Sequence, residues 1–117
     1  MLNARATKRY LRSSPRKMRL VIDLIRGKSA AQALATLRFS TKTASKDAEM
    51  VLRSAIANVM EKATAASERV DEGKLFVSAA FVNQGPTAKR ISPAPMGRAY
   101  RIRKRSHHLT IEVSVTQ

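Results

Sequence analysis

The sequence contains no cysteine, and only 4% of its residues are aromatic. Without cysteine the chain can form no disulfide, no cysteine-based zinc site and no thiol nucleophile. The sequence has no run of about 18 apolar residues, so no membrane span is predicted. The stretch 1–14 has no apolar segment of the kind found in secretory signals. These absences favour an intracellular, soluble protein with no membrane partner.

Acidic residues are few and unevenly placed. Asp and Glu number 8 against 23 Lys and Arg, which gives a formal net charge of +15 and a pI near 11.5. No acid precedes Asp23, and none lies between Glu72 and Glu112. Such a balance is typical of a protein that binds a polyanion, which can be RNA, DNA or an anionic membrane. The two acid-free stretches predict two basic segments that bind one ligand, and a solvated charged face is the alternative.

The length of 117 residues suits one domain. Hydrophobic residues make up 44% of the chain, and with few aromatics the core must consist of Ala, Val, Ile, Leu and Met. A domain of this size buries roughly two-thirds of the surface that its unfolded chain exposes. We expect a single domain over 1–117, with a globular body formed by 1–82 and 109–117 and an extended hairpin over 83–108.

Three helices are predicted from the spacing of apolar residues. The first begins with Ser14 as N-cap and Pro15 at the first helical position, and is expected to end at Gly27. Its apolar face would comprise Met18, Val21, Leu24 and Ile25, with Leu20 beside them. A second, short helix fits 30–37. A third fits 43–65, where Ala, Val, Leu and Ile recur at steps of three and four residues.

Beyond a polar turn at 70–73 the apolar period changes from 3.6 to 2. This alternation predicts strands over 75–82 and 109–115, the second with one face buried. The segment 4–11 fits either a strand or an ordered arm.

Between these two strands, the segment 83–108 has no acid and few large apolar residues. If the flanking strands pair antiparallel, it must form a long hairpin with its turn near 93–97, where proline and glycine are concentrated. About ten residues per arm would reach roughly 30 Å from the body. A lone ribbon of this length is marginal in water, and its cations repel one another, so it needs a surface that supplies counter-charge. A disordered basic loop in the free protein is the alternative.

Phosphate is the natural counter-charge, because the planar guanidinium of arginine suits phosphate oxygens and also stacks on bases. Alternate residues of a strand share one side, so Arg101, Arg103 and Arg105 are expected to point the same way. The candidate RNA-binding residues are Arg9, Arg12, Arg16, Lys17, Arg19, Arg26, Lys28, Lys89, Arg90, Arg98, Arg101, Arg103, Lys104, Arg105 and His108.

Other kinds of site have little support. His107 and His108 would point to opposite faces of a strand, and no third metal ligand lies near them in the sequence. The serine and aspartate residues lack the partners of a nucleophile system. Gly27-Lys28-Ser29 lacks the first glycine of a phosphate-binding loop and follows a helix. We therefore predict no catalytic residue, no metal and no cofactor.

Several ordered motifs resemble one family, that of the twenty-second protein of the large ribosomal subunit, in its bacterial form. The stretches 14–21 and 23–28 are similar to its first helix, and 54–58 to its long-helix motif. Its hairpin and closing strand are matched by Gly85-Pro86, Lys89-Arg90, Pro93, Gly97-Arg98-Ala99, Ile102, Lys104-Arg105 and His108-Leu109-Thr110. The sequence departs from the family at Pro93-Ala94-Pro95-Met96, where an arginine usually follows the proline, at Asn83-Gln84, where acids are common, and at Ser106-His107.

The resemblance implies an α+β fold, with three helices packed on a three-stranded antiparallel sheet and a long extended basic β-hairpin. It implies a structural constituent of the large ribosomal subunit that binds 23S-type ribosomal RNA, aids assembly and is not an enzyme. Its other partners would be neighbouring large-subunit proteins and the nascent polypeptide, and it would not be a homo-oligomer. The hairpin would line the polypeptide exit tunnel, with Pro93, Ala94, Pro95, Met96 and Gly97 as a tunnel-facing tip. The implied location is the ribosome of the cytoplasm or of an organelle.

Two other functions fit parts of the pattern. A histone-like architectural protein also binds DNA with basic β-arms that carry a proline near the tip. Such proteins are shorter obligate dimers with large aromatic cores, and this chain has three Phe among 117 residues. The basic subunit of a tRNA-processing ribonucleoprotein depends on an Arg-Asn-Arg-type helix motif, which the sequence lacks.

Overall fold

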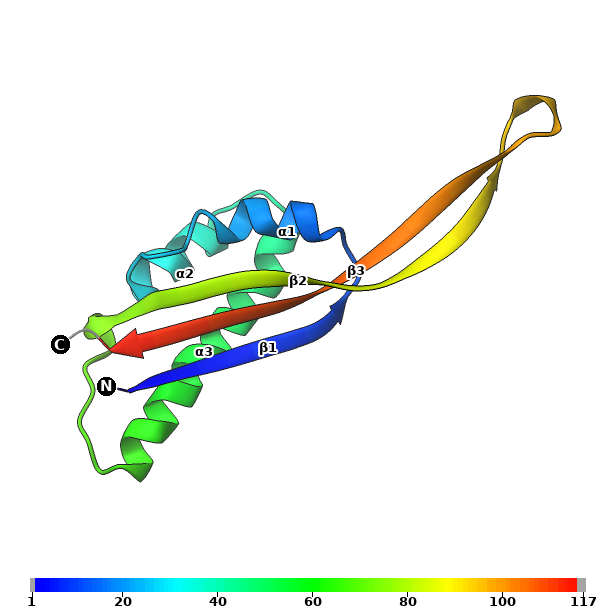
Figure 1. Ribbon diagram of the computed structural model, residues 1–117. Helices are drawn as coiled ribbons and strands as arrows, with labels where there is room; N and C mark the ends of the chain where they lie inside the picture. Colours follow the sequence, from blue (N-terminus) through cyan, green and yellow to red (C-terminus); the bar gives the residue numbers. More distant parts are fainter. Residues whose placement is uncertain (1, 116–117) are drawn as a thin grey trace.

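A computed structural model describes residues 2–115 of the chain. The order of its main elements is β1 (Asn3–Leu11), α1 (Pro15–Ile22), α2 (Ala30–Arg38), α3 (Ala44–Ala65), β2 (Leu75–Pro93) and β3 (Ala99–Val115), with short 3-10 turns at Glu72–Lys74 and Pro95–Gly97. The helices cover one face of a three-stranded antiparallel sheet of order β1-β3-β2 (Figure 1). Beyond this body β2 and β3 continue together as a long twisted hairpin (Figure 1). The predicted fold class is confirmed.

The core lies between the central strand β3 and the long helix α3. Leu109, Ile111 and Val113 of β3 are fully buried, as are Leu52 and Val59 of α3. Ala48, Ala55 and Ala63 of α3 are also buried, and their small side chains let the helix lie close to the sheet. The described core is built from Ala, Val, Ile, Leu and Met, as the shortage of aromatic residues predicted.

The start of α1 is confirmed and its end is corrected. The Ser14 hydroxyl accepts a hydrogen bond from the Lys17 backbone N–H at 3.3 Å, as an N-cap does. The helix ends at Ile22, however, and tighter turns lead to Gly27. Gly27 has the expected left-handed backbone with φ of 82°, but its N–H donates to the Val77 carbonyl oxygen of β2 at 3.1 Å. Because this hydrogen bond is made to a distant strand and not within the helix, the helix ends before Gly27. The spacing of nearby residues cannot predict such a bond.

The buried face of this first segment also differs from the prediction. Met18, Val21, Ile22 and Ile25 are fully buried, whereas Leu24 is 45% exposed. Leu24 is turned outward because it lies in the tight turns after the helix, where the spacing of the α-helix no longer applies. The other helices agree with their predicted bounds to within one residue, and 4–11 forms a strand.

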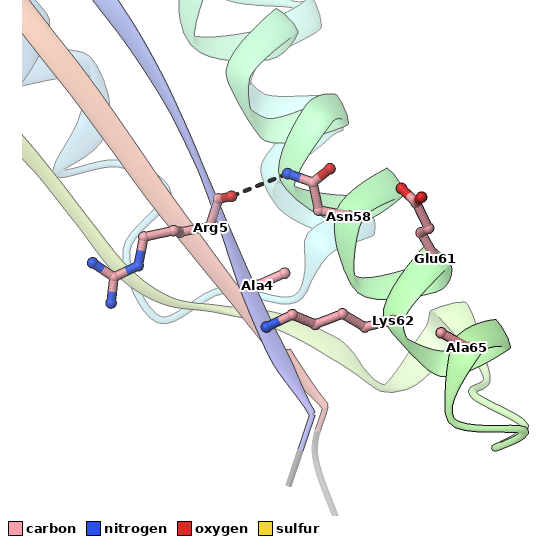
Figure 2. A pocket seen from close by; sticks show the side chains of 6 residues that line it. All are labelled: Ala4, Arg5, Asn58, Glu61, Lys62 and Ala65. Atoms are coloured by element: carbon pink, nitrogen blue, oxygen red, sulfur yellow. Dashed lines mark hydrogen bonds between the residues drawn. The ribbon is translucent and has the colours of Figure 1, made fainter.

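In the body, each edge of the sheet is partly covered by side chains of the helical layer. At β1, the Asn58 amide of α3 donates to the Arg5 carbonyl oxygen at 3.0 Å (Figure 2), and the Lys62 amine donates to the Asn3 carbonyl oxygen at 2.8 Å. At β2, the Arg26 guanidinium donates twice to the Ala80 carbonyl oxygen, at 3.1 and 2.7 Å. Covering an edge in this way prevents another strand from pairing there.

Candidate nucleic-acid interface

The segment 83–108 forms the predicted hairpin. β2 and β3 pair without interruption from Thr87 opposite Arg105 to Pro93 opposite Ala99. The turn is closed by a hydrogen bond from the Ala94 N–H to the Arg98 carbonyl oxygen at 2.9 Å. The described chain extends 67 × 26 × 16 Å, so the hairpin makes the molecule much longer than it is wide.

Cations occupy both faces of this ribbon. Strand alternation places Arg101, Arg103 and Arg105 on one face, and Lys89 joins them because it pairs directly with Arg103. Arg90 and Lys104 lie on the opposite face. The hairpin can therefore meet polyanionic surfaces on two sides at once.

The hairpin cations have no acidic partner within the described part of the chain. The ion pairs among residues 2–115 all involve cations of the body, such as Arg26 with Asp23 and Arg53 with Glu49. Every lysine and arginine between Lys89 and Arg105 is exposed. Their charges are thus available to an external ligand and repel one another in its absence.

The two acid-free segments of the sequence meet at the base of the hairpin. A groove of about 780 Å³ lies there, between the start of α1 and the two hairpin strands. We call it the basic groove, and its lining residues are Arg12, Ser13, Lys17, Pro86, Thr87, Ala88, Arg90, Arg103, Lys104, Arg105 and Ser106. Six of these side chains are cationic and none is acidic. Arg12 and Lys17 come from the N-terminal segment and the other four from the hairpin, so the two acid-free segments lie side by side.

A second hollow, between β1 and α3, has a different character. It measures about 450 Å³ and is lined by Ala4, Arg5, Asn58, Glu61, Lys62 and Ala65 (Figure 2). It has only two cations, of which Arg5 is paired with Glu112, and it also contains the carboxylate of Glu61. Asn58 and Lys62 are engaged with the edge of β1. This hollow therefore offers no concentration of positive charge.

The remaining candidate cations are distributed around the basic groove and beyond it. Arg9 is exposed near the end of β1, Arg16 is exposed on α1, and Arg98 is exposed beside the hairpin turn. The side chain of Lys28 is exposed, while its backbone pairs with Val77 of β2 through a 2.9 Å hydrogen bond.

Two candidate arginines have partners inside the protein. Arg19 donates from its guanidinium to the Val82 carbonyl oxygen at 3.2 Å. Arg26 is engaged more fully, because it also donates to the Asp23 carboxylate at 2.7 Å. Both hold α1 and the turns after it against β2, which places the start of α1 beside the hairpin.

His108 is half-buried, and the structure places it against β1. Its Nδ1 accepts a hydrogen bond from the Tyr10 backbone N–H at 3.0 Å. The Tyr10 and His108 rings meet edge to face with centroids 5.0 Å apart. One of the ring nitrogens of His108 is thus used within the protein.

Sequence reasoning missed the uncharged residues at the hairpin base, notably Tyr10, Ser13, Gly85 and Ser106. Ser13 and Ser106 line the basic groove. Gly85-Pro86 was matched to the family's hairpin, but the register shift at this point of β2 depends on pairing with β3. The only local signal was this Gly-Pro pair within an otherwise extended segment.

The hairpin tip carries no charge from Pro93 to Gly97. Met96 is 95% exposed and has φ of 64°, a left-handed conformation that is uncommon for a residue with a side chain. Gly97 also has positive φ, 69°. The tip is therefore a tight, uncharged turn that presents an apolar side chain outward.

Two further observations concern the described residues alone. Over residues 2–115, no group of three or more His, Asp or Glu side chains is arranged to hold a metal ion. Within the same range, none of the helices combines the length and apolar character needed to cross a membrane.

Comparison with known proteins gives a consistent result. The family model described as ribosomal protein L22p/L17e matches residues 6–114. The large ribosomal subunit protein uL22 of Chlorobaculum tepidum is 54% identical over 112 residues, which cover 96% of this chain and 92% of that protein. The protein of the same name from Solibacter usitatus is 51% identical over 113 residues, which cover 97% of this chain and 96% of that protein. The uL22 of Chlorobium phaeovibrioides is 54% identical over 112 residues, with 96% and 92% covered.

Proposed function

The chain belongs to the ribosomal protein L22p/L17e family, and from this premise we propose that it is a structural constituent of the large ribosomal subunit that binds its RNA through the basic groove. The resemblance found in the sequence motifs is thereby confirmed: the family is one of structural ribosomal proteins, and the relatives compared are bacterial. The proposal assigns the protein to the ribosome of the cytoplasm and to translation.

The observation that carries this proposal is the meeting of two basic segments in one groove. Arg12 and Lys17 approach the hairpin cations Arg90, Arg103 and Arg105 with no acid between them. A folded chain accepts this accumulation of like charge only at some cost in stability, which a polyanion would remove by supplying counter-charge. RNA phosphate fits because arginine forks bind its oxygens in pairs. Binding of this kind needs no catalytic group.

The exposed cations outside the groove extend the proposed RNA contact. We assign to it the whole candidate set that the sequence indicated, with the groove cations at its centre. Arg19 and Arg26 contribute in a second way, since they hold α1 beside the hairpin. His108 would reach RNA only through its remaining ring nitrogen, because Nδ1 binds the Tyr10 N–H.

We further propose a division of labour within the single domain. The body, 1–82 and 109–117, and the cationic arms of the hairpin dock the protein on ribosomal RNA and neighbouring large-subunit proteins, which aids assembly. The tip, 93–97, has no charge with which to bind phosphate. A tight turn with an exposed Met96 suits contact with a nascent polypeptide on the wall of the exit tunnel. In this proposal the protein acts as one copy per subunit.

Co-sedimentation with large subunits tests this division. Replacement of Arg101, Arg103 and Arg105 by Ala should reduce the amount of protein incorporated, because these side chains share one cationic face. Deletion of 94–96 should leave incorporation nearly intact and change how nascent chains or small ligands behave in the tunnel. As a control, Lys46→Ala/Arg69→Ala/Lys74→Ala removes the same charge from exposed positions of the body. If the tip deletion abolishes incorporation while the triple arginine variant assembles normally, the division is wrong.

A further inference from the structure

The base of the hairpin is the point at which a three-stranded sheet becomes a two-stranded ribbon. β1 ends at Leu11, which pairs with His107, and beyond this point only β2 and β3 continue. A two-stranded ribbon is marginally stable and has no third strand to hold its direction. Register shifts occur on both sides of β3 here, between Lys8 and Leu11 of β1 and between Gln84 and Thr87 of β2. Such bulges bend a strand and increase its twist.

On the β1 side, Tyr10 is held by His108. Its φ of 61° places it in the left-handed region, which is costly for an aromatic residue and persists only where the surroundings impose it. The conformation directs the Tyr10 N–H to His108 Nδ1 at 3.0 Å. The edge-to-face contact of the two rings, at 5.0 Å, adds a second restraint. A backbone bond and a ring contact therefore hold the same pair of residues.

On the β2 side, the chain passes so close to β3 at Gly85 that any larger residue would force a side chain of β3 to move. A Cβ built at Gly85 would lie 2.8 Å from the Ser106 hydroxyl and 3.3 Å from the His108 ring. The Ser106 hydroxyl donates to the Pro86 carbonyl oxygen at 2.6 Å. The His108 ring thus binds Tyr10 at the β1 bulge and leaves no room for a side chain at Gly85 in the β2 bulge.

The start of α1 is attached to the same place by His107. This side chain is fully buried, and its Nδ1 lies 3.0 Å from the Ser13 carbonyl oxygen. Because a carbonyl oxygen only accepts, Nδ1 is the donor. Ser13 precedes the Ser14 N-cap, so this bond sets the position of α1 relative to β3.

We infer that Tyr10, Ser13, Gly85, Ser106, His107 and His108 form a locked joint, in which His108 and Tyr10 are positioning residues for the hairpin. The joint contains no arginine, lysine or acid, yet Ser13 and Ser106 line the basic groove. Arg12 and Lys17 lie on the body side of the joint, and Arg103 and Arg105 on the hairpin side. The angle at the joint decides whether these cations can contact one stretch of RNA together. The consequence for binding rests on the proposed function, whereas the geometry of the joint does not.

Two substitutions of His108 separate the effect of its hydrogen bond from the effect of its ring contact. His108→Asn keeps an acceptor oxygen near the place of Nδ1, whereas His108→Phe keeps a ring and removes the acceptor. Tyr10→Gly adopts positive φ freely and keeps its N–H, so it removes only the ring contact. We expect the hairpin to lose its fixed direction in His108→Phe and to retain it in both His108→Asn and Tyr10→Gly, each of which keeps the hydrogen bond and loses the ring contact.

Double electron–electron resonance measures the distance between two spin labels, and on the free full-length protein it reports the direction of the hairpin. The chain has no cysteine, so spin labels at Glu61→Cys on α3 and at Ile91→Cys, which is 76% exposed on the hairpin, are the only ones attached. We expect one narrow distance distribution in the parent and in His108→Asn, and a broadened or shifted one in His108→Phe. A broad distribution in the parent, or an unchanged one in His108→Phe, would contradict the inference that the joint fixes the direction of the hairpin.

Binding of purified large-subunit RNA supplies the second readout. In His108→Phe we expect affinity to fall by about tenfold, as for the misplacement of one charge-assisted contact. Tyr10→Gly keeps the bond to Nδ1 and lies outside the proposed RNA contacts, so it should keep most of the parent's affinity. If the distances change and affinity does not, the joint has no part in RNA binding. If the parent itself fails to bind this RNA, the proposed function is wrong while the distance result still decides on the joint.

Discussion

Lys89 of β2 and Arg103 of β3 lie directly opposite each other on one face of the hairpin. Both side chains are exposed, and neither has an acidic partner among the described residues. Like charges in directly opposed strand positions destabilise the pair. The hairpin therefore gives up stability in the free protein at the position where we propose that it binds phosphate.

Replacing Lys89 with Glu should reverse this balance. The new carboxylate would face Arg103 and stabilise the free protein by up to about 1 kcal/mol, as an opposite-charge cross-strand pair does. The same change should weaken RNA binding, because one exposed cation of the hairpin becomes an anion. Chemical denaturation and filter binding measure the two effects. Lys74→Glu, in the turn before β2, is the control. It changes the net charge by the same amount, at a position far from the hairpin. Weaker folding together with unchanged RNA affinity would contradict the prediction.

Ser14→Ala should lower the free energy of unfolding by about 1 kcal/mol, because the hydroxyl that accepts from the Lys17 N–H is lost. In a domain of this size that loss corresponds to a decrease of roughly 4 °C in Tm. Ser14→Asp restores an acceptor and should recover most of the stability. Thermal melting of the free protein is the measurement, and an unchanged midpoint in Ser14→Ala would show that the cap contributes nothing.

Gly85→Ala should destabilise the protein by about 1–3 kcal/mol, as overpacking of a tight contact does. The reason is the 2.8 Å approach of the added Cβ to the Ser106 hydroxyl. Ser106→Ala removes that oxygen, so the double variant should be more stable than the sum of the two single losses predicts. Gly73→Ala is the control, because its added Cβ comes no closer than 3.4 Å to another atom, the Asp71 carboxylate. Additive losses in denaturant titrations would mean that Gly85 and Ser106 are not coupled.

The elements with strong local signals were predictable from the sequence. The spacing of apolar residues gave α3 to within one residue, and Ser14-Pro15 gave the start of α1. The end of α1 was wrong because the Gly27 N–H is bound by Val77, fifty residues further along the chain. The alternation of β3 and the absence of acids from 83–108 were enough to predict the hairpin and its cations.

The joint could not be predicted, because it depends on pairing between distant strands. Nothing in the local sequence of Tyr10 indicates a left-handed backbone, which arises where β1 shifts register against β3. His108 was predicted as an RNA-binding residue from its place in a motif, and its bond to the Tyr10 N–H becomes visible only when β1 and β3 are paired. The same holds for the basic groove, which is lined by both Arg12 and Arg105 although they lie far apart in the sequence.

The salt dependence of RNA binding tests the central claim most directly. Each phosphate neutralised releases counterions, so the logarithm of the affinity should fall linearly with the logarithm of salt concentration. For the parent protein we predict a steep line. Arg12→Ala/Arg105→Ala removes one cation from each side of the basic groove. For this variant the line should be shallower, with the magnitude of its slope smaller by about 2. Arg69→Ala/Lys74→Ala removes the same charge from the far side of the body and should leave the slope unchanged. A flat line for the parent, or the same slope for both double variants, would contradict the proposal that RNA binds in the basic groove.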